Sequence, residues 1–202
     1  GSEMCIRDSI ENVKKYGVTP IVAINKFSND TEKEIETLKQ TLEGIVEVSL
    51  LENWEKGGEG GIELAKAILR TLDNKESNYK PLYTYDDTTI EEKIETIATK
   101  IYGADKVVYT AAAARQKKRL TELGYGNLPI CMAKNQYSLS DDAKKLGRPE
   151  NFDIHIREVY VSAGAGFVVA LTGAIMTMPG LPKVPAANGI DVSEDGMITG
   201  LF

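Results

Sequence analysis

The residues with the clearest chemical potential surround the only tryptophan of the chain. Residues 52–61 read ENWEKGGEGG, so Trp54 lies among charges and four glycines rather than in an apolar run. Glycines that open a helix let backbone N–H groups approach an anion or a flat ligand, and an indole beside them could stack on a heterocycle. The alternative is a half-buried tryptophan that covers a sheet edge. The stretch lacks the Lys-Ser/Thr pair of a phosphate-binding Walker loop.

A second polar group follows the apolar run TPIVAIN of residues 19–25. This β-branched run predicts a strand buried on both faces. Ligands of open α/β sheets bind beyond the carboxyl ends of the strands, where Asn25, Lys26 and Phe27 would emerge. The segment is similar to the Asn-Lys-x-Asp base-recognition motif of P-loop GTPases, but Ser28 stands at the aspartate position. A GTPase-like switch is therefore disfavoured.

Asp30 and His155 could each take part in chemistry, but we expect structural roles for both. Asp30 precedes Thr31 at the start of a predicted helix, so we expect it to cap that helix. His155 is the only histidine and alternates within a strand pattern, so we expect a structural role rather than a Ser/His/Asp or Cys/His mechanism. No Cys/His cluster supports zinc. Another strand-to-loop junction, MAKNQYSLSDD, offers a further set of polar side chains: Lys134, Gln136, Tyr137 and Ser138.

Composition narrows the class of partner. The 202 residues carry a net charge of -6, which argues against nucleic acid because phosphate binding needs a clustered basic surface. The basic residues 115–119 lie on a predicted helix and are assigned to a solvated face. Cys5 and Cys131 cannot form a disulfide framework, and Cys131 is expected to be buried; the chain is assigned to the cytoplasm. No apolar segment reaches the roughly 20 residues that span a bilayer, so no membrane contact is expected.

The elements that must position these groups begin with a doubly wound pattern. A helix ends at Gly17, the strand TPIVAIN follows, and a Thr31/Glu34 capping box opens an amphipathic helix over residues 31–43. The strand GIVEVSL and the glycine loop then precede a helix that ends near residue 72. We expect this last helix to bury an apolar stripe of Ile62, Ala65, Ile68, Leu69 and Leu72.

A polar stretch at residues 73–87 predicts a linker. Beyond it, Thr88 and Thr89 offer caps for a helix with apolar residues on one face. A second βαβ unit is predicted from the strand DKVVYT, a helix stopped by Gly124, and the strand LPICMA. Strand-like segments over residues 154–173 and a terminal hairpin follow. The chain therefore has two parts on either side of the linker.

Several segments together resemble the C-terminal part of the formate–tetrahydrofolate ligase (10-formyltetrahydrofolate synthetase) family. They include TPIVAINKFSNDTEKE, ENWEKGGEGGIELA, GNLPICMAKNQYSLSDD and FDIHIREVYVSAGAGFVVALTGAIMTMPGLPKVPAANGIDV, and the similarity extends from about Ile10 to Phe202. The resemblance implies an enzyme that joins formate to N10 of tetrahydrofolate with ATP and Mg, through formyl phosphate. The P-loop of that family lies upstream, and no G-x-x-x-x-G-K-[ST] occurs in these 202 residues.

The resemblance also implies roles for individual residues. Phe27 and Trp54 match the two aromatics that clamp the folate ring, and Leu50 or Leu51 would line the same pocket. Asn25 and Lys26 would reach a nucleotide base or ribose. Ser28 replaces a proline of many relatives and would loosen the pocket wall, and the loop Met178 to Asn188 would adjoin the site or serve packing alone. No catalytic residue and no metal ligand is assigned within the chain.

These observations combine into one expected organisation. Residues 1–9 are interpreted as a non-native tail, 10–80 as the end of a P-loop-type doubly wound parallel sheet domain, and 81–202 as a smaller C-terminal α/β domain. The small-molecule partners are formate, tetrahydrofolate and ATP, and the full-length protein is expected to be a homotetramer. We expect the fragment itself to be inactive. The alternative is a non-catalytic folate- or nucleotide-binding or assembly module.

Overall fold

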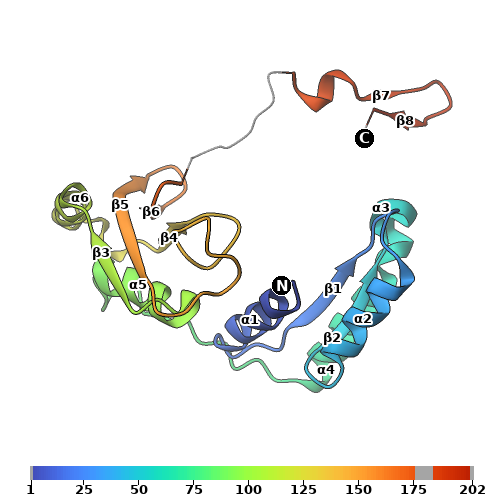
Figure 1. Cartoon of the computed structure of the whole chain (residues 1–202), viewed down its shortest axis with the longest axis horizontal. Coiled ribbons are helices and arrows are strands. Elements are labelled where there is room, and N and C mark those ends of the chain that lie inside the picture. Colours follow the sequence, from blue (N-terminus) through green and yellow to red (C-terminus); the bar gives the residue numbers. More distant parts are fainter. Residues whose placement is uncertain (1, 176–183, 201–202) are drawn as a thin grey trace.

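The computed structural model describes residues 2–175 and 184–200 and contains two α/β lobes (Figure 1). We call residues 2–74 the N-terminal lobe and residues 90–175 the C-terminal lobe. A segment without helix or strand, residues 75–89, connects them. This segment overlaps the predicted linker of residues 73–87, although α4 continues to Asn74. The division into domains at residue 80 stays a prediction.

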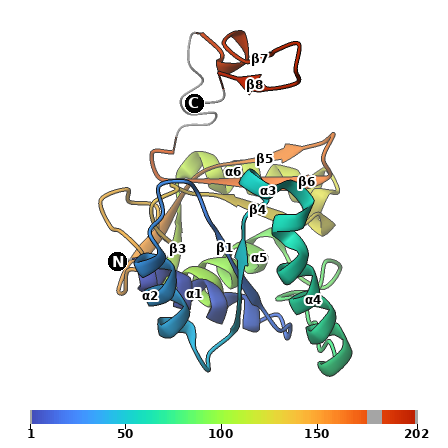
Figure 2. The same cartoon turned by 90° about the vertical axis from the view of Figure 1, so that its right-hand side faces the viewer.

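The N-terminal lobe contains a two-stranded parallel sheet with a helix between its strands. Its elements are α1 (Ser2–Lys14), β1 (Ile21–Asn25), α2 (Glu32–Leu42), β2 (Glu47–Leu51), α3 (Asn53–Lys56), the 3-10 helix η1 (Gly57–Gly61) and α4 (Ile62–Asn74). Asn25 lies opposite Leu51 in the parallel register, so the carboxyl ends of β1 and β2 coincide. Figure 2 shows α2 and α4 flanking this sheet. The β1-α2-β2 unit agrees with the α/β class expected from the sequence.

The capping box of α2 is formed as predicted. Thr31 Oγ1 accepts the N–H of Glu34, and Glu34 Oε2 accepts the N–H of Thr31 at 2.9 Å. Helix α1 begins at Ser2, so helical structure extends into the residues 1–9 that the sequence analysis assigned to a tail. Their foreign origin stays a prediction.

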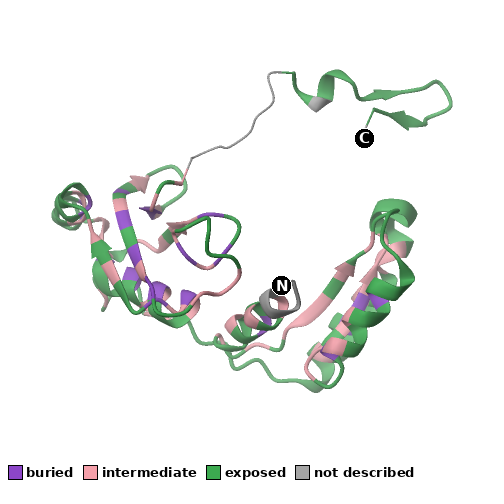
Figure 3. Cartoon of the chain, in the orientation of Figure 1, coloured by how far each residue is buried: buried purple, intermediate pink, exposed green. Residues whose placement is uncertain are grey.

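The apolar stripe predicted for α4 does not face the sheet. Ile62, Leu69 and Leu72 are 48%, 58% and 70% exposed, whereas Ala67 is 1% exposed. The less exposed positions of α4 are instead Ala67 and the half-buried residues Leu64 and Thr71, a narrow strip that matches the small width of a two-stranded sheet. The burial colours of Figure 3 show how much of α4 is exposed.

The C-terminal lobe is built on a mixed four-stranded sheet. Its elements are α5 (Ile90–Ile97), the π-helix η2 (Ala98–Tyr102), β3 (Lys106–Tyr109), α6 (Ala111–Glu122), the 3-10 helix η3 (Tyr125–Asn127), β4 (Ile130–Ala133), β5 (Asp153–Ser162) and β6 (Phe167–Thr172). The strand order is β3-β5-β6-β4.

The prediction of a second βαβ unit is wrong in topology. The strands β3 and β4 pair in parallel with β5 and β6, respectively, and β5 and β6 are antiparallel to each other. β3 and β4 therefore run in opposite directions at opposite edges of the sheet. The sequence order of strand, helix and strand is as expected, but the β5–β6 hairpin inserts between the two strands and changes their relation.

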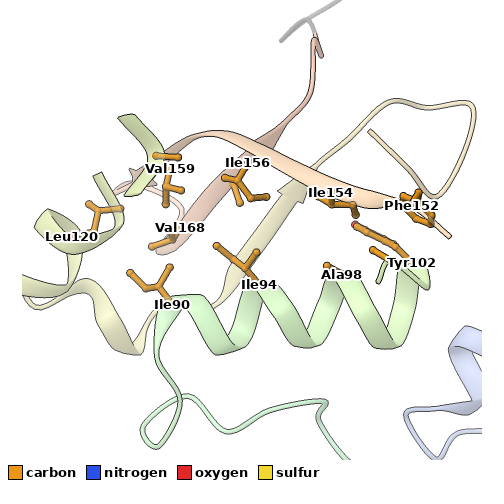
Figure 4. Packing of buried hydrophobic residues seen from close by; sticks show 13 residues of the cluster. Ile90, Ile94, Ala98, Tyr102, Leu120, Phe152, Ile154, Ile156, Val159 and Val168 are labelled. Atoms are coloured by element: carbon orange, nitrogen blue, oxygen red, sulfur yellow. The ribbon is translucent and has the colours of Figure 1, made fainter. Parts of the chain in front are cut away.

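Helix α5 covers one face of this sheet and forms the largest core of the described residues (Figure 4). Ile90 and Ile94 of α5 and Ala98 at the start of η2 follow one another at four-residue intervals, and they belong to one cluster with Ile154 and Ile156 of β5. Each of these five side chains is 1% exposed or less. The apolar face predicted for this helix is thus its packing surface.

Cys131 is exposed, contrary to the expectation of a buried thiol. Its neighbours on β4, Ile130 and Met132, pack against the core. Because successive strand residues point to opposite faces, Cys131 points to the face opposite that core. The apolar run alone did not distinguish the two faces.

The two lobes are tied together by α1 and the linker. Asn12 Nδ2 donates to Ile101 O at 3.0 Å, and Arg148 of the C-terminal lobe contacts Asp8 at 3.3 Å. In the linker, Lys80 N donates to Tyr16 O at 2.9 Å. The linker is therefore attached at defined points rather than free.

The predicted terminal hairpin is confirmed. Its strands β7 (Asp191–Val192) and β8 (Ile198–Thr199) are antiparallel and follow the 3-10 helix η4 (Ala186–Asn188). Most of the loop Met178 to Asn188, to which the resemblance gave a place near the site, lies outside the described residues.

Candidate functional site

The structure brings Phe27 and Trp54 together beyond the carboxyl ends of β1 and β2. Their ring centroids are 6.5 Å apart and the ring planes are inclined by 57°. Both side chains are large and apolar yet 46% and 49% exposed. Two neighbouring aromatic faces in partial contact with solvent suit the recognition of a flat ligand. Such a ligand would fit between them only after the rings become parallel at a separation of about 7 Å, twice a van der Waals contact.

The position of Phe27 is fixed by a short turn. Asp30 Oδ2 accepts the N–H of Phe27 at 2.8 Å, and the N–H of Asp30 donates to Phe27 O at 3.1 Å. The expectation that Asp30 caps α2 is therefore wrong. Thr31 is the N-cap, which leaves the Asp30 carboxylate to hold the backbone of the aromatic residue.

The glycines after Trp54 let the chain fold back on the helix that carries the indole. Glu52 N donates to Gly60 O at 3.1 Å. A Cβ atom on Gly60 would lie 2.4 Å from the carbonyl carbon of Glu52, closer than any side chain permits. Gly57 adopts a φ of 59°, which also favours glycine. The glycine-rich sequence thus positions the four-residue helix α3 at the end of β2.

A chain of charges lies beside the aromatic pair. Lys26 Nζ is 2.7 Å from Glu32 Oε1 and 3.8 Å from Glu52 Oε1, and Lys56 Nζ is 2.7 Å from Glu52 Oε2. The hydrogen bond to Glu32 raises the pKa of Lys26. The hydrogen bond from Lys56 lowers the pKa of Glu52. Lys26 is therefore held as a cation by carboxylates of the chain itself.

These contacts bear on the nucleotide role that the resemblance gave to Asn25 and Lys26. Asn25 is the last residue of β1, and Lys26 N donates to Leu51 O at 2.9 Å. Both residues therefore lie at the same sheet end as the aromatic pair. A ligand anion at Lys26 would have to compete with Glu32 and Glu52. Their nucleotide role stays a prediction.

Leu50 and Leu51 are both half-buried at the end of β2. Consecutive strand residues point to opposite faces of the sheet. At most one of these two side chains can therefore face the same side as the aromatic pair, and the choice between them stays open.

The polar residues predicted in the C-terminal lobe do not join this site. Lys134 Nζ donates to the carbonyl groups of Asn135, at 2.9 Å, and Ser138, so it supports its own loop. Gln136 and Tyr137 line a separate cavity together with His155. The His155 side chain is 58% exposed and contacts Asp141, and its expected structural role stays a prediction.

Three features of the aromatic site were missed from the sequence. They are the Asp30 contact with Phe27, the Glu52 bridge between two lysines, and the return of Gly60 onto Glu52. The spacing of Phe27 and Asp30, three residues apart in a polar Ser-Asn-Asp run, is the signal that could have indicated the turn.

The described residues contain neither a metal-binding cluster nor a membrane-spanning helix. Within residues 2–175 and 184–200, no group of three or more His, Cys, Asp or Glu side chains could hold a metal ion. No helix in the same described part is long and apolar enough to cross a membrane.

Comparison with known protein families gives one match over nearly the whole chain. A family model described as formate–tetrahydrofolate ligase matches residues 3–202 of the 202. The match confirms the resemblance inferred from the sequence and includes most of the residues assigned there to a tail. The chain therefore belongs to the formate–tetrahydrofolate ligase family.

Proposed function

We propose that this chain supplies the folate-binding surface of an ATP-dependent ligase that joins formate to tetrahydrofolate. The observation that carries the proposal is the exposed pair of Phe27 and Trp54 at the coincident ends of two parallel strands. Membership of the family supports the substrate class. A pterin is a flat heterocycle, and each stacking face contributes about 1–3 kcal/mol by analogy with base stacking on aromatic side chains.

The chemical contribution of such a surface is positioning. In the proposed reaction, ATP converts formate into formyl phosphate, and N10 of tetrahydrofolate then attacks the formyl carbon and releases phosphate. Holding the pterin between two rings would fix the direction from which the amine approaches, which lowers the entropic part of the barrier. The turn through Asp30 and the loop through Gly60 hold the backbone beside the two aromatic residues, so that only the side chains have to turn when a ligand enters.

The proposal assigns no catalytic residue to these 202 residues. The sequence contains no Walker phosphate loop, and the described residues contain no cluster that fits Mg²⁺, so no step is derived through that ion. We expect the isolated chain to bind tetrahydrofolate without forming product. A tetrameric assembly and a cytoplasmic location of the full-length protein are part of the same proposal.

A second candidate function is a non-catalytic assembly module. The exposed apolar stripe of α4, with Leu69 and Leu72 at 58% and 70% exposure, is the observation that favours it. Loss of self-association on substitution of these leucines, without any folate binding by the parent chain, would favour the assembly module over the ligand site.

The experiment that tests the folate site uses Trp54 as its own reporter, because it is the only tryptophan. Tetrahydrofolate should quench its fluorescence saturably, and calorimetry should give the same dissociation constant. The substitution Trp54→Ala should weaken calorimetric binding about tenfold, or about 1.4 kcal/mol, whereas Trp54→Phe should retain most of it. Tyr160→Ala removes another exposed aromatic from the C-terminal lobe and should have no effect. A folded chain that does not bind tetrahydrofolate would contradict the proposal.

A further inference from the structure

The C-terminal lobe contains a cavity that the folate proposal does not use. Its volume is about 890 Å³, within the range of about 300–1,000 Å³ typical of small-molecule sites. It lies where the loop after β4 meets the start of β5, and its walls include Gln136, Tyr137, Phe152 and His155. The cavity therefore combines aromatic surface with hydrogen-bonding groups.

A carboxylate at this cavity orients the only histidine of the chain. Asp141 Oδ2 accepts the backbone N–H of His155 at 2.8 Å and lies 2.9 Å from the ring nitrogen Nδ1. A carboxylate only accepts, so Nδ1 carries the proton in this contact. In the neutral ring, Nε2 is then left as a hydrogen-bond acceptor.

The backbone around this pair is tightly constrained. Gly173 N donates to His155 O at 2.9 Å. A Cβ atom on Gly173 would lie 2.6 Å from Asp141 O, and the φ of Gly173 is 48°. Asp141 is thus held between the ends of β5 and β6. The Asp141–His155 contact belongs to a fixed frame rather than to a mobile surface.

Three carboxylates and two lysines line the cavity. The carboxylates are engaged within the protein: Asp141 accepts the backbone N–H of His155, Asp142 accepts the backbone N–H of Lys144 at 2.9 Å, and Asp153 lies 3.4 Å from Lys106 Nζ. In contrast, no carboxylate of the described residues forms an ion pair with the ammonium groups of Lys144 and Lys145. Lys145 Nζ lies 5.7 Å from the ring centroid of Phe152, and both residues line the cavity.

We propose that this cavity binds a small anionic metabolite that carries a carboxylate or phosphate together with a hydroxyl or amine. Lys144 and Lys145 contact the anionic group, and His155 Nε2 accepts a hydrogen bond from the hydroxyl or amine. The aromatic surfaces of Tyr137 and Phe152 pack against the carbon skeleton. The site lies in a different lobe from Phe27 and Trp54 and does not depend on the folate proposal.

The test uses the imidazole C–H signals of His155, which a proton NMR spectrum of the whole chain shows without assignment because there is one histidine. The probes are glycerol 3-phosphate and lactate, titrated at constant pH and constant ionic strength. A saturable shift with glycerol 3-phosphate alone identifies a phosphate ligand, and one with lactate identifies a carboxylate ligand. Either result supports the site. The absence of a saturable shift with both probes, or the same shift with sodium chloride, overturns the proposal.

The variants test the assigned contacts. A double substitution, Lys144→Met with Lys145→Met, should weaken probe binding about tenfold, as expected for two partly exposed charge contacts. Lys118→Met removes a cation from α6, where it pairs with Glu122, and should leave binding unchanged. Equal weakening by the double substitution and by Lys118→Met would show a general charge effect and overturn the assignment. The unchanged dispersion of the remaining spectrum reports that each variant is folded.

Discussion

The two lobes differ in how much of their apolar surface they bury. In residues 6–74, where burial is described, the N-terminal lobe has four buried hydrophobic residues: Ile10, Ile35, Leu42 and Ala67. In contrast, thirteen buried residues form one continuous cluster in the C-terminal lobe. This contrast is visible in Figure 3 as purple segments concentrated on one side of the molecule. The lobe that carries the proposed folate surface is thus the lobe with the smaller core.

The difference in buried apolar surface indicates which lobe provides most of the stability of this chain. Stability follows the apolar area removed from water, so the C-terminal lobe should provide most of the cooperative unfolding signal. The N-terminal lobe depends on α1 and the linker, which attach it to the C-terminal lobe through contacts such as Asn12 to Ile101 and Lys80 to Tyr16.

The largest effect is expected from Ile94→Ala. Ile94 is 0% exposed in the centre of the α5 face, and its truncation should lower the free energy of unfolding by roughly 3–4 kcal/mol because it leaves a cavity. The control Leu72→Ala removes a side chain of α4 that is 70% exposed and should change stability by less than about 0.5 kcal/mol. Urea unfolding followed by circular dichroism measures both. Similar losses for the two variants would remove the proposed asymmetry.

A second large effect is expected from a buried cation in the same lobe. Lys93 is 0% exposed, and its ammonium group donates to the carbonyl oxygens of Tyr85, Gly126 and Leu128 at 2.9, 2.7 and 3.3 Å. Burial lowers the pKa of Lys93. Lys93→Met should cost roughly 3 kcal/mol because it leaves these carbonyl groups without a donor.

The control for Lys93 is Lys118→Met, since Lys118 is an exposed cation that pairs with Glu122. This control should be nearly neutral in the same urea experiment. Because Lys93 joins the linker at Tyr85 to the C-terminal lobe, Lys93→Met should also increase proteolysis within residues 75–89. A stable variant with an unchanged cleavage rate would show that the linker is held by other contacts.

Alkaline pH should destabilise the C-terminal lobe through its buried tyrosines. Burial raises the pKa of Tyr102 to about 12, above the ordinary value of about 10, and burial also raises the pKa of Tyr109. Between pH values of about 10 and about 12, the unfolded chain loses the Tyr102 proton and the folded chain keeps it. The free energy of unfolding therefore falls as pH rises through this range. The loss due to Tyr102 should be about 1.4 kcal/mol between pH 9 and pH 11.

The measurement is the free energy of unfolding in urea at pH 9 and pH 11 for the parent chain and for Tyr102→Phe. In Tyr102→Phe, the free energy of unfolding should change less between pH 9 and pH 11 than in the parent chain. The ring stays and the ionisable hydroxyl is removed, so the contribution of Tyr102 to the pH dependence is lost. Identical pH dependence in both proteins would show that Tyr102 does not titrate differently on folding.

Local sequence signals predicted the elements of this fold better than their mutual arrangement. The capping boxes at Thr31 and Thr89 are both present, because they depend on residues three positions apart. The predicted relation of β3 to β4 was wrong because it depends on the β5–β6 hairpin, which begins twenty positions beyond the end of β4. Periodicity also identified α4 as amphipathic but could not show that its apolar stripe lacks a covering sheet.

The candidate site shows the same limit. The resemblance indicated Phe27 and Trp54, and the structure places their rings 6.5 Å apart. Asp30 accepts the Phe27 N–H with its side-chain carboxylate, and Gly60 accepts the Glu52 N–H with its backbone carbonyl. The polar run before Asp30 is a weak signal for the first contact, and the second contact has no residue-type signature. The contact of His155 with Asp141 was missed because the two residues lie fourteen positions apart.

The smallest predicted effect is the most direct comparison of the lobes, because α2 and α5 begin with the same capping box. Glu34 N–H donates to Thr31 Oγ1 at 3.3 Å, and Glu92 N–H donates to Thr89 Oγ1 at 3.2 Å. Thr31→Ala and Thr89→Ala should each cost their own helix about 1 kcal/mol. Hydrogen exchange at the Glu34 and Glu92 amides should show comparable losses of protection.

The urea midpoint of the cooperative unfolding transition should differ between the two variants. Thr89→Ala weakens the helix that carries Ile90 and Ile94, so the urea midpoint of the cooperative transition should decrease. Thr31→Ala should increase exchange in α2 and leave that midpoint nearly unchanged, because the helix belongs to the lobe with the smaller core. Equal decreases in the midpoint would mean that α1 and the linker couple the lobes into one unfolding unit. The proposed folate surface would then take its rigidity from the C-terminal core, despite the small core beneath it.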